Sequence, residues 1–261
     1  MIIKRGQISI FIILAFIILG IFLILIMSTG TNEELIEDEG RADLITEKES
    51  IKSYVKECLR EKLEDAVFYD SLQGGYLGIV PNSISFESGG IDLAIPIYYY
   101  RGDMLIPEIE RIKNEIKFGF NLGILECMDF SPIKNGAELD LKGKAETEIN
   151  ILKDKITAKT DIPFLVHIKE SSFVLGSFYI EAPSDLLNLY ETARIITTKQ
   201  EGSQNKVCIS CMPRWMEQRE VNIYANEYFD GQSYMILYDI QSKKDNSYFN
   251  FVHALEYGDT A

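Results

Sequence analysis

Four cysteines are the residues in this sequence best suited to covalent chemistry, and they are unevenly spaced. Cys58 and Cys127 stand alone, whereas Cys208 and Cys211 form a single C-x-x-C motif. Outside the cytosol an even number of cysteines favours disulfide bonds, and four cysteines allow three pairings. The motif by itself also suits a thioredoxin-like redox site, and four converging cysteines would suit a structural zinc ion. The elements around the cysteines must decide between these chemistries.

The helices and strands expected around the cysteines favour disulfides. Cys58 and Cys127 each lie on the apolar stripe of a predicted helix, so the two helices would pack together and be linked by a bridge. A thioredoxin-like pair opens a helix after a strand, whereas Cys208 and Cys211 come late in the chain, before the segment MPRW and predicted β-hairpins. We therefore predict the pairs Cys58–Cys127 and Cys208–Cys211, with no metal ion and no cofactor.

The patterns of common catalytic sites do not occur in the sequence. His167 and His253 are its two histidines, and both lie in apolar segments, so we interpret them as strand residues rather than as zinc ligands or bases. No serine lies in a G-x-S-x-G elbow, and the chain has no G-x-x-x-x-G-K-[ST] phosphate loop. We therefore expect a non-enzymatic protein. An enzyme whose active site follows none of these patterns is the alternative.

Aromatic residues provide one candidate contact surface. Tyr98, Tyr99 and Tyr100 are consecutive in a predicted strand, so their side chains alternate between its two faces and at least one is expected to be exposed. Together with Trp215 they would form an aromatic surface for contact with a protein or a glycan.

The longest apolar stretch of the chain lies near its N-terminus. Residues 8–27 carry no charge, and a helix of that length spans about 30 Å, the thickness of the hydrocarbon core of a bilayer. Lys4 and Arg5 precede the stretch, and basic residues stay on the cytoplasmic side. We therefore predict a cytoplasmic segment over residues 1–7, a membrane helix over residues 8–28 and an extracytoplasmic remainder. A cleaved export signal and a buried core helix are the alternatives.

The motif KRGQIS at residues 4–9 resembles the precursor of an archaeal type IV pilin. In that family a charged pair and a glycine precede the cut, and glutamine begins the mature chain. The resemblance implies cleavage between Gly6 and Gln7, with the apolar helix retained. Pilins often carry glutamate at the fifth mature position, where this chain has Phe11, so the resemblance bears on processing more than on filament assembly.

Two short segments, YVKECL at residues 54–59 and LQGGY at residues 72–76, resemble archaeal membrane-anchored envelope proteins whose function is not known. The resemblance carries no activity over to this chain.

The charge of the chain excludes one large class of partners. The formal net charge of the chain is −14, and Lys4 and Arg5 are the only charged residues in the sequence before residue 29. Residues 29–261 therefore contain 24 Lys and Arg against 40 Asp and Glu, a net charge of −16. Such a surface repels phosphate backbones, so nucleic-acid binding is not expected. Hydrophobic residues make up 46% of the chain, which is enough for a folded core rather than a disordered tail.

The pattern of apolar residues and turns predicts an α+β fold of antiparallel sheets packed with helices. A first helix is expected over residues 51–72, with its end near Gly74. Two further helices are expected to begin at Pro107 and at Ser184-Asp185. Hairpins are expected at Gly89-Gly90 and Asp230-Gly231, and strands over 145–152, 156–162, 172–181 and 248–257.

The domain organisation predicted from these elements has three parts beyond the membrane helix. Residues 29–50 are acidic, are broken by Gly30 and Gly40, and are interpreted as a stalk or linker. Residues 51–140 form an α+β lobe and residues 141–261 a lobe richer in strands.

The sequence therefore predicts a single-pass cell-envelope protein with a structural or interaction role. A pilin-like filament subunit is the more specific form of this prediction. Its expected partners are membrane lipid around residues 8–28 and other envelope proteins or copies of itself. The alternative is a membrane-tethered module that binds a solute or glycan in a cleft lined by the tyrosines and Trp215.

Overall fold

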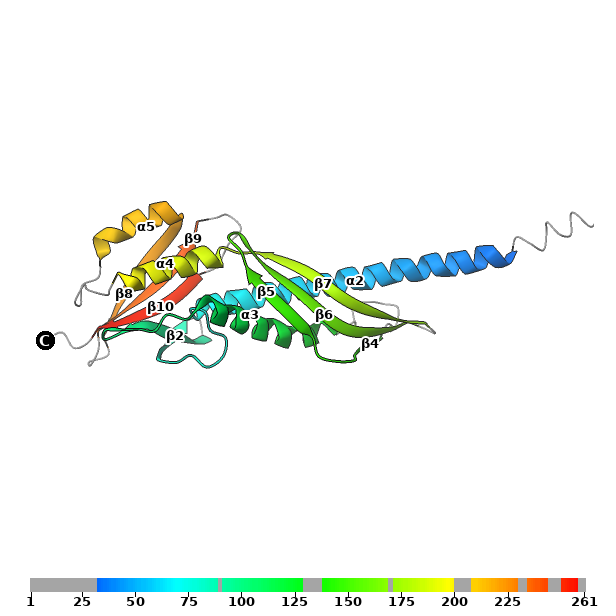
Figure 1. Ribbon diagram of the computed structural model, residues 1–261, viewed down its shortest axis with the longest axis horizontal. Coiled ribbons are helices and arrows are strands. Elements are labelled where there is room, and N and C mark those ends of the chain that lie inside the picture. Colours follow the sequence, from blue (N-terminus) through cyan, green and yellow to red (C-terminus); the bar gives the residue numbers. More distant parts are fainter. Residues whose placement is uncertain are drawn as a thin grey trace, which may run out of the picture. The chain divides into compact units, whose positions relative to one another are not determined.

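The computed structural model describes residues 32–88, 91–128, 138–168, 171–199, 208–229, 234–243 and 250–257. Within these residues the fold is α+β, with four α-helices and two β-sheets (Figure 1). The contacts divide the chain into two units, residues 1–53 and residues 54–261. The described part of the first unit, residues 32–53, is helical, and both sheets belong to the second unit.

The first described helix, α2, runs from Asn32–Leu72 and includes Gly40, where the sequence predicted a break. That expectation is wrong, because one interior glycine costs a helix only about 1 kcal/mol and the residues on either side favour helix. The end of the helix was predicted correctly. The amide of Gly74 donates to the carbonyl of Ser71 (3.1 Å), and that of Gly75 to the carbonyl of Asp70 (2.8 Å), which is a Schellman cap with Gly74 left-handed at φ +53°.

The larger sheet has six strands in the order β1-β2-β10-β9-β8, with β3 paired to β2. Their bounds are β1 Ser83–Ser88, β2 Ile91–Tyr100, β3 Asp103–Met104, β8 Val221–Phe229, β9 Tyr234–Ser242 and β10 Asn250–Tyr257. Both predicted hairpins are present, because β1 pairs with β2 and β8 with β9 in antiparallel register.

Two expectations about this sheet are corrected by the pairing of β2 with β10. The pairing is parallel, so the sheet is mixed rather than purely antiparallel. It also joins the early strands β1–β3 to the late strands β8–β10, so the fold does not divide near residue 140, and residues 54–261 form one compact unit.

The second sheet has four antiparallel strands, with β6 paired to β4, β5 and β7 along its length. Its strands are β4 Glu138–Leu141, β5 Glu146–Ile151, β6 Lys155–Ile168 and β7 Ser171–Pro183. Strands β5 to β7 follow the predicted alternation of apolar and polar residues. Strand β4 was not predicted, since four residues are too few to show a period.

Three further helices pack against the sheets. Helix α3 (Ile109–Gly123) contacts β5 and continues into a short 3₁₀ helix, η1 (Ile124–Met128). Helix α4 (Leu186–Thr198) lies on β9 and β10, as Figure 1 shows. Both were predicted. A 3₁₀ turn, η2 (Ile209–Cys211), and helix α5 (Met212–Arg219), which contacts β8, were not.

The core of the mixed sheet has a different character on its two faces. One face carries an aliphatic cluster formed by Ile95, Ile97, Leu237, Val252 and Ala254. The other carries aromatic rings. His253 stacks on Tyr238 with 5.3 Å between ring centroids and lies 4.8 Å from Tyr98, while Phe251 meets Tyr190 of α4 edge-on at 6.3 Å. Alternating residues of β10 therefore supply both faces.

We expect Gly74→Ala to lower the free energy of unfolding by about 3 kcal/mol, because it adds both backbone strain and overlap. A Cβ at Gly74 would lie 2.5 Å from the carbonyl oxygen of Val252 and 2.7 Å from Cγ of Pro96. Gly102→Ala is the matched control, since Gly102 also has positive φ (+113°) but no atom would lie within 4 Å of its Cβ. Urea unfolding of both variants tests this, and equal losses would show that overlap at Gly74 is unimportant.

Candidate functional site

The structure pairs the cysteines as the sequence analysis predicts. Cys58 of α2 is bonded to Cys127 of η1, with 5.7 Å between their Cα atoms, and Cys208 is bonded to Cys211, with 5.3 Å. Lys62 and Glu126, close to the first bridge, form an ion pair between the same two elements. The first disulfide therefore links two distant parts of the chain, while the second closes a local turn.

The predicted aromatic contact surface is not formed by all of its members. The side chains of Tyr98 and Tyr99 are buried, with 0% and 8% exposed, and Tyr100 is 37% exposed. Tyr98 donates a hydrogen bond to the carbonyl of Gly74 (2.8 Å), and the ring of Tyr99 packs on Tyr257 (5.7 Å). Both faces of this strand end are thus covered.

Trp215 is half-buried on α5, an element separate from the strand that carries Tyr100. Gly6 and Gln7, the predicted processing site, and residues 8–28, the predicted membrane helix, lie outside the described residues.

A cavity of about 560 Å³ forms an open polar groove between α4 and α5. Its described lining comprises Lys153, Leu187, Asn188, Glu191, Glu217, Gln218, Arg219 and Glu220. Lys153 comes from the turn between β5 and β6, and Glu220 is the left-handed residue that ends α5, at φ +54°. The groove is therefore built from three segments that are far apart in the sequence, and its lining mixes basic and acidic groups.

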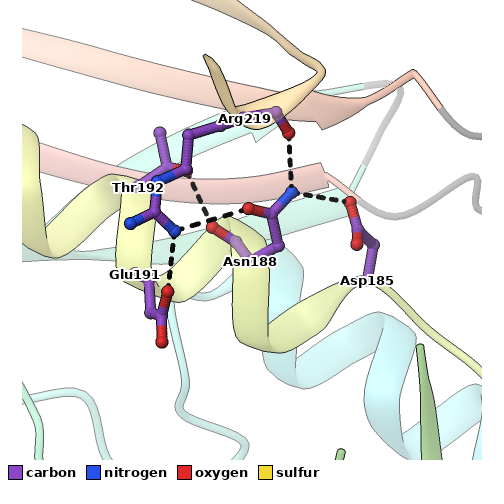
Figure 2. A network of polar contacts seen from close by, with 5 residues as sticks. All are labelled: Asp185, Asn188, Glu191, Thr192 and Arg219. Carbon is purple, nitrogen blue, oxygen red and sulfur yellow. Dashed lines mark hydrogen bonds and ion pairs between the residues drawn. The ribbon is translucent and has the colours of Figure 1, made fainter. Parts of the chain in front are cut away.

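A network of polar contacts holds one wall of the groove to the other (Figure 2). The guanidinium of Arg219 donates to the carboxylate of Glu191 (2.7 Å). The side-chain amide of Asn188 donates to the carbonyl of Arg219 (2.9 Å) and to the carboxylate of Asp185 (3.0 Å). The hydroxyl of Ser242 on β9 also donates to Asp185 (2.8 Å). The network therefore ties the C-terminal end of α5 to α4 and the sheet.

The sequence analysis did not identify this network, although part of its signal was visible. Asp185, Asn188 and Glu191 recur at three-residue spacing and so lie on one side of α4. Their partner Arg219 belongs to α5, which was not predicted. The described lining offers two basic side chains, three carboxylates and two amides, which suits contact with a polar ligand or structural support.

We expect Arg219→Met to lower the free energy of unfolding by about 1 kcal/mol, since it removes the ion pair with Glu191 while keeping the aliphatic stem. Lys155→Met is the matched control, because Lys155 pairs with Glu181 at the same distance of 2.7 Å with greater exposure of the cation. Because solvent screens this exposed pair, the control should lose less stability than Arg219→Met. A loss in the control as large as in Arg219→Met, measured by urea unfolding, would contradict the role given to the network.

Asp70 and His253 are fully buried, away from the groove. Neither the carboxylate oxygens of Asp70 nor the ring nitrogens of His253 have a hydrogen-bond partner among the described residues. Burial raises the pKa of Asp70 well above its usual range, and the nearby Glu115 carboxylate adds to this. Burial lowers the pKa of His253 to about 3. Burial therefore favours the neutral form of both side chains, and neither reaches a surface where it could act on a substrate.

His167 lies on a strand, as the sequence predicts, near the end of β6. Its Nδ1 is 2.8 Å from the hydroxyl of Ser172, and its Nε2 is 3.9 Å from the carboxylate of Asp140. In the part of the chain that the structure describes, His, Cys, Asp and Glu side chains do not gather in threes where a metal ion could bind.

The helices of the described residues include none with the length and apolar character needed to cross a membrane. No protein-family model, curated protein or solved structure matches the chain.

Proposed function

We propose that the chain is a single-pass envelope protein, anchored by residues 8–28, whose acidic α+β domain lies outside the cytoplasm and has a structural or interaction role. The observation that carries the proposal is the combination of an uncharged 20-residue apolar run with a domain in which all four cysteines are paired. Disulfides persist in oxidising compartments, and the basic residues before the run keep its start in the cytoplasm.

A filament subunit processed like a pilin is the sharper form of this proposal. It is supported by the motif at residues 4–9, which an anchor without processing would not need. Because Phe11 stands where pilins commonly have a glutamate, cleavage at this motif would not by itself imply assembly into filaments.

The polar groove between α4 and α5 supports a second candidate function, a tethered module that binds a polar solute or glycan. The groove has the volume of a small-ligand site and offers several hydrogen-bonding side chains. Saturable binding of a glycan by the full-length protein, lost when Glu217 and Gln218 in the groove are both replaced by alanine, would favour this candidate over the first.

Mass spectrometry of the N-terminus of the protein, isolated from its native membrane, tests the anchor and the processing together. We expect a chain that begins at Gln7, and we expect Gly6→Leu to block the cut. A chain that keeps residues 1–6 would leave a simple anchor and remove the case for pilin-type processing. A chain that begins near Thr31 would show a cleaved signal and contradict the anchor.

Protease added to intact cells tests the orientation. Residues beyond 29 should be digested, while a tag at Met1 should survive until the cells are opened. Digestion of the tag in sealed cells would contradict the proposed topology.

A further inference from the structure

The two disulfides of the protein have different surroundings. Cys127 is fully buried, and its bridge to Cys58 spans 69 residues of sequence. Cys208 and Cys211 are only half-buried, and their bridge spans three residues. A bridge that closes so short a loop restricts the unfolded chain less than a long-range bridge does, so stabilisation explains its presence less well.

The half-buried pair lies where a helix begins. Cys208 directly precedes η2, which leads into α5, so residues 209–219 form one helical run. The amide of Cys211 donates to the carbonyl of Cys208 (3.0 Å), which is the first hydrogen bond of that run. The sequence analysis expected β-hairpins rather than a helix after this pair; the structure places a helix there, and the element that precedes the pair is α4 rather than a strand.

The groups around Cys208 favour a thiolate at that position. The hydroxyl of Ser210 lies 3.7 Å from the sulfur of Cys208, within reach of a hydrogen bond to it. The free amides at the start of a helical run carry partial positive charge, and the first turns of η2 and α5 contain no acidic residue. Reactive cysteines occur in partly exposed, electropositive surroundings of this kind.

The helical run is held at points that do not involve its sulfur atoms. Met212 is buried at the start of α5, and the network of Asn188, Glu191 and Arg219 holds the other end to α4. The bridge between Cys208 and Cys211 can therefore open without detaching α5 from the fold. This is what a site that alternates between disulfide and dithiol requires.

We propose that Cys208 and Cys211 form a thiol–disulfide exchange site that acts on cysteines of other proteins. In the reduced form, the Cys208 thiolate attacks a disulfide of the partner protein, forming a mixed disulfide and releasing one partner sulfur as a thiolate that takes up a proton. Cys211 then loses its proton and attacks Cys208, and the second partner sulfur leaves. The partner disulfide gains two electrons and two protons, and Cys208 and Cys211 end as a disulfide. The reverse sequence oxidises a dithiol of the partner.

Equilibration of the purified full-length protein in detergent with graded mixtures of reduced and oxidised glutathione provides the first test. Because the protein is purified, the result does not depend on the membrane orientation or processing proposed above. After acid quenching and alkylation, peptide mapping should show half-reduction of Cys208–Cys211 at a ratio of [GSH]² to [GSSG] at least about tenfold lower than for Cys58–Cys127. Reduction of both bridges at the same ratio, or of neither before unfolding, would overturn the proposal.

Single-cysteine variants test the separate roles of the two sulfurs. Cys211→Ser should form a mixed disulfide with oxidised glutathione at Cys208, and Cys208→Ser should react at Cys211 at least about tenfold more slowly. Adding Ser210→Ala to Cys211→Ser should move the half-maximal rate of Cys208 alkylation to higher pH. Equal rates for the two single variants, or an unchanged pH profile, would overturn the assignment of Cys208 as the attacking thiol.

Discussion

Replacing Cys58 and Cys127 together by alanine is expected to lower the free energy of unfolding by about 4 kcal/mol, close to the whole stability of many small domains. The bridge joins α2 to η1 across 69 residues, so its removal releases a long loop in the unfolded chain. The ion pair between Lys62 and Glu126, which joins the same two elements, would remain in the variant. That pair is largely solvent-exposed on the Glu126 side, so it offsets little of the loss.

The double variant Cys208→Ala/Cys211→Ala is the matched control for this experiment. Its bridge closes a loop of only four residues, for which the same entropy relation gives about 2 kcal/mol. Urea unfolding of the full chain in detergent, followed by circular dichroism, measures both losses. A control variant that loses as much as the Cys58 and Cys127 variant would contradict the argument from loop length.

His253→Phe is expected to make the protein markedly more resistant to acid. The imidazole of His253 lies between the rings of Tyr98 and Tyr238, and phenylalanine would keep this packing without polar nitrogen atoms. The pKa of His253 is about 3 in the folded protein, against 6.5 for an ordinary histidine. Between these values the unfolded chain binds the extra proton, so His253 destabilises the fold as the pH falls from 6.5 to 3. At pH 4 the penalty is about 3 kcal/mol.

Unfolding curves at several pH values test this prediction. The gain from His253→Phe should grow as the pH falls from 6.5 toward 3, and it should be small and constant above pH 7. Asp70→Asn should behave in the opposite way. Because burial raises the pKa of Asp70, the unfolded chain loses the proton first, and stability falls as the pH rises above about 4. Asparagine would therefore stabilise the protein at neutral pH and not at pH 3. A pH-independent effect of either variant would show that its side chain is not a buried neutral group.

Local signals in the sequence were reliable where a single residue type determines the backbone. Gly74 marks the end of α2 because a left-handed residue is needed there. The glycine pair at 89–90, which lies outside the described residues, correctly predicted that the strands on either side of it, β1 and β2, would pair antiparallel. The spacing of Ile112, Ile116 and Phe120 also predicted the apolar stripe of α3, and all three residues are buried. In each case the signal and the structure that it predicts lie within one turn or one element.

Features that depend on distant partners could not be predicted in the same way. Strand alternation indicated that at least one of the three tyrosines would be exposed, and Tyr100 is. It could not indicate that Tyr98 and Tyr99 would both be buried, because the groups that cover them, Gly74 and Tyr257, come from elsewhere in the chain. Helix α5 has only eight residues and includes Pro213, so it shows too little periodicity to be recognised. The groove was missed with it, since Arg219 is the link between its walls.

The position of β10 has a consequence for how the protein is made. This strand contains the last described residues of the chain, yet it lies inside the mixed sheet, between β2 and β9. Until it emerges from the ribosome, β2 has an open edge, and Tyr99 lacks its strand partner Leu255. The sheet can therefore close only after synthesis has passed residue 257, and until then the open edge of β2 is exposed to pairing with a wrong strand.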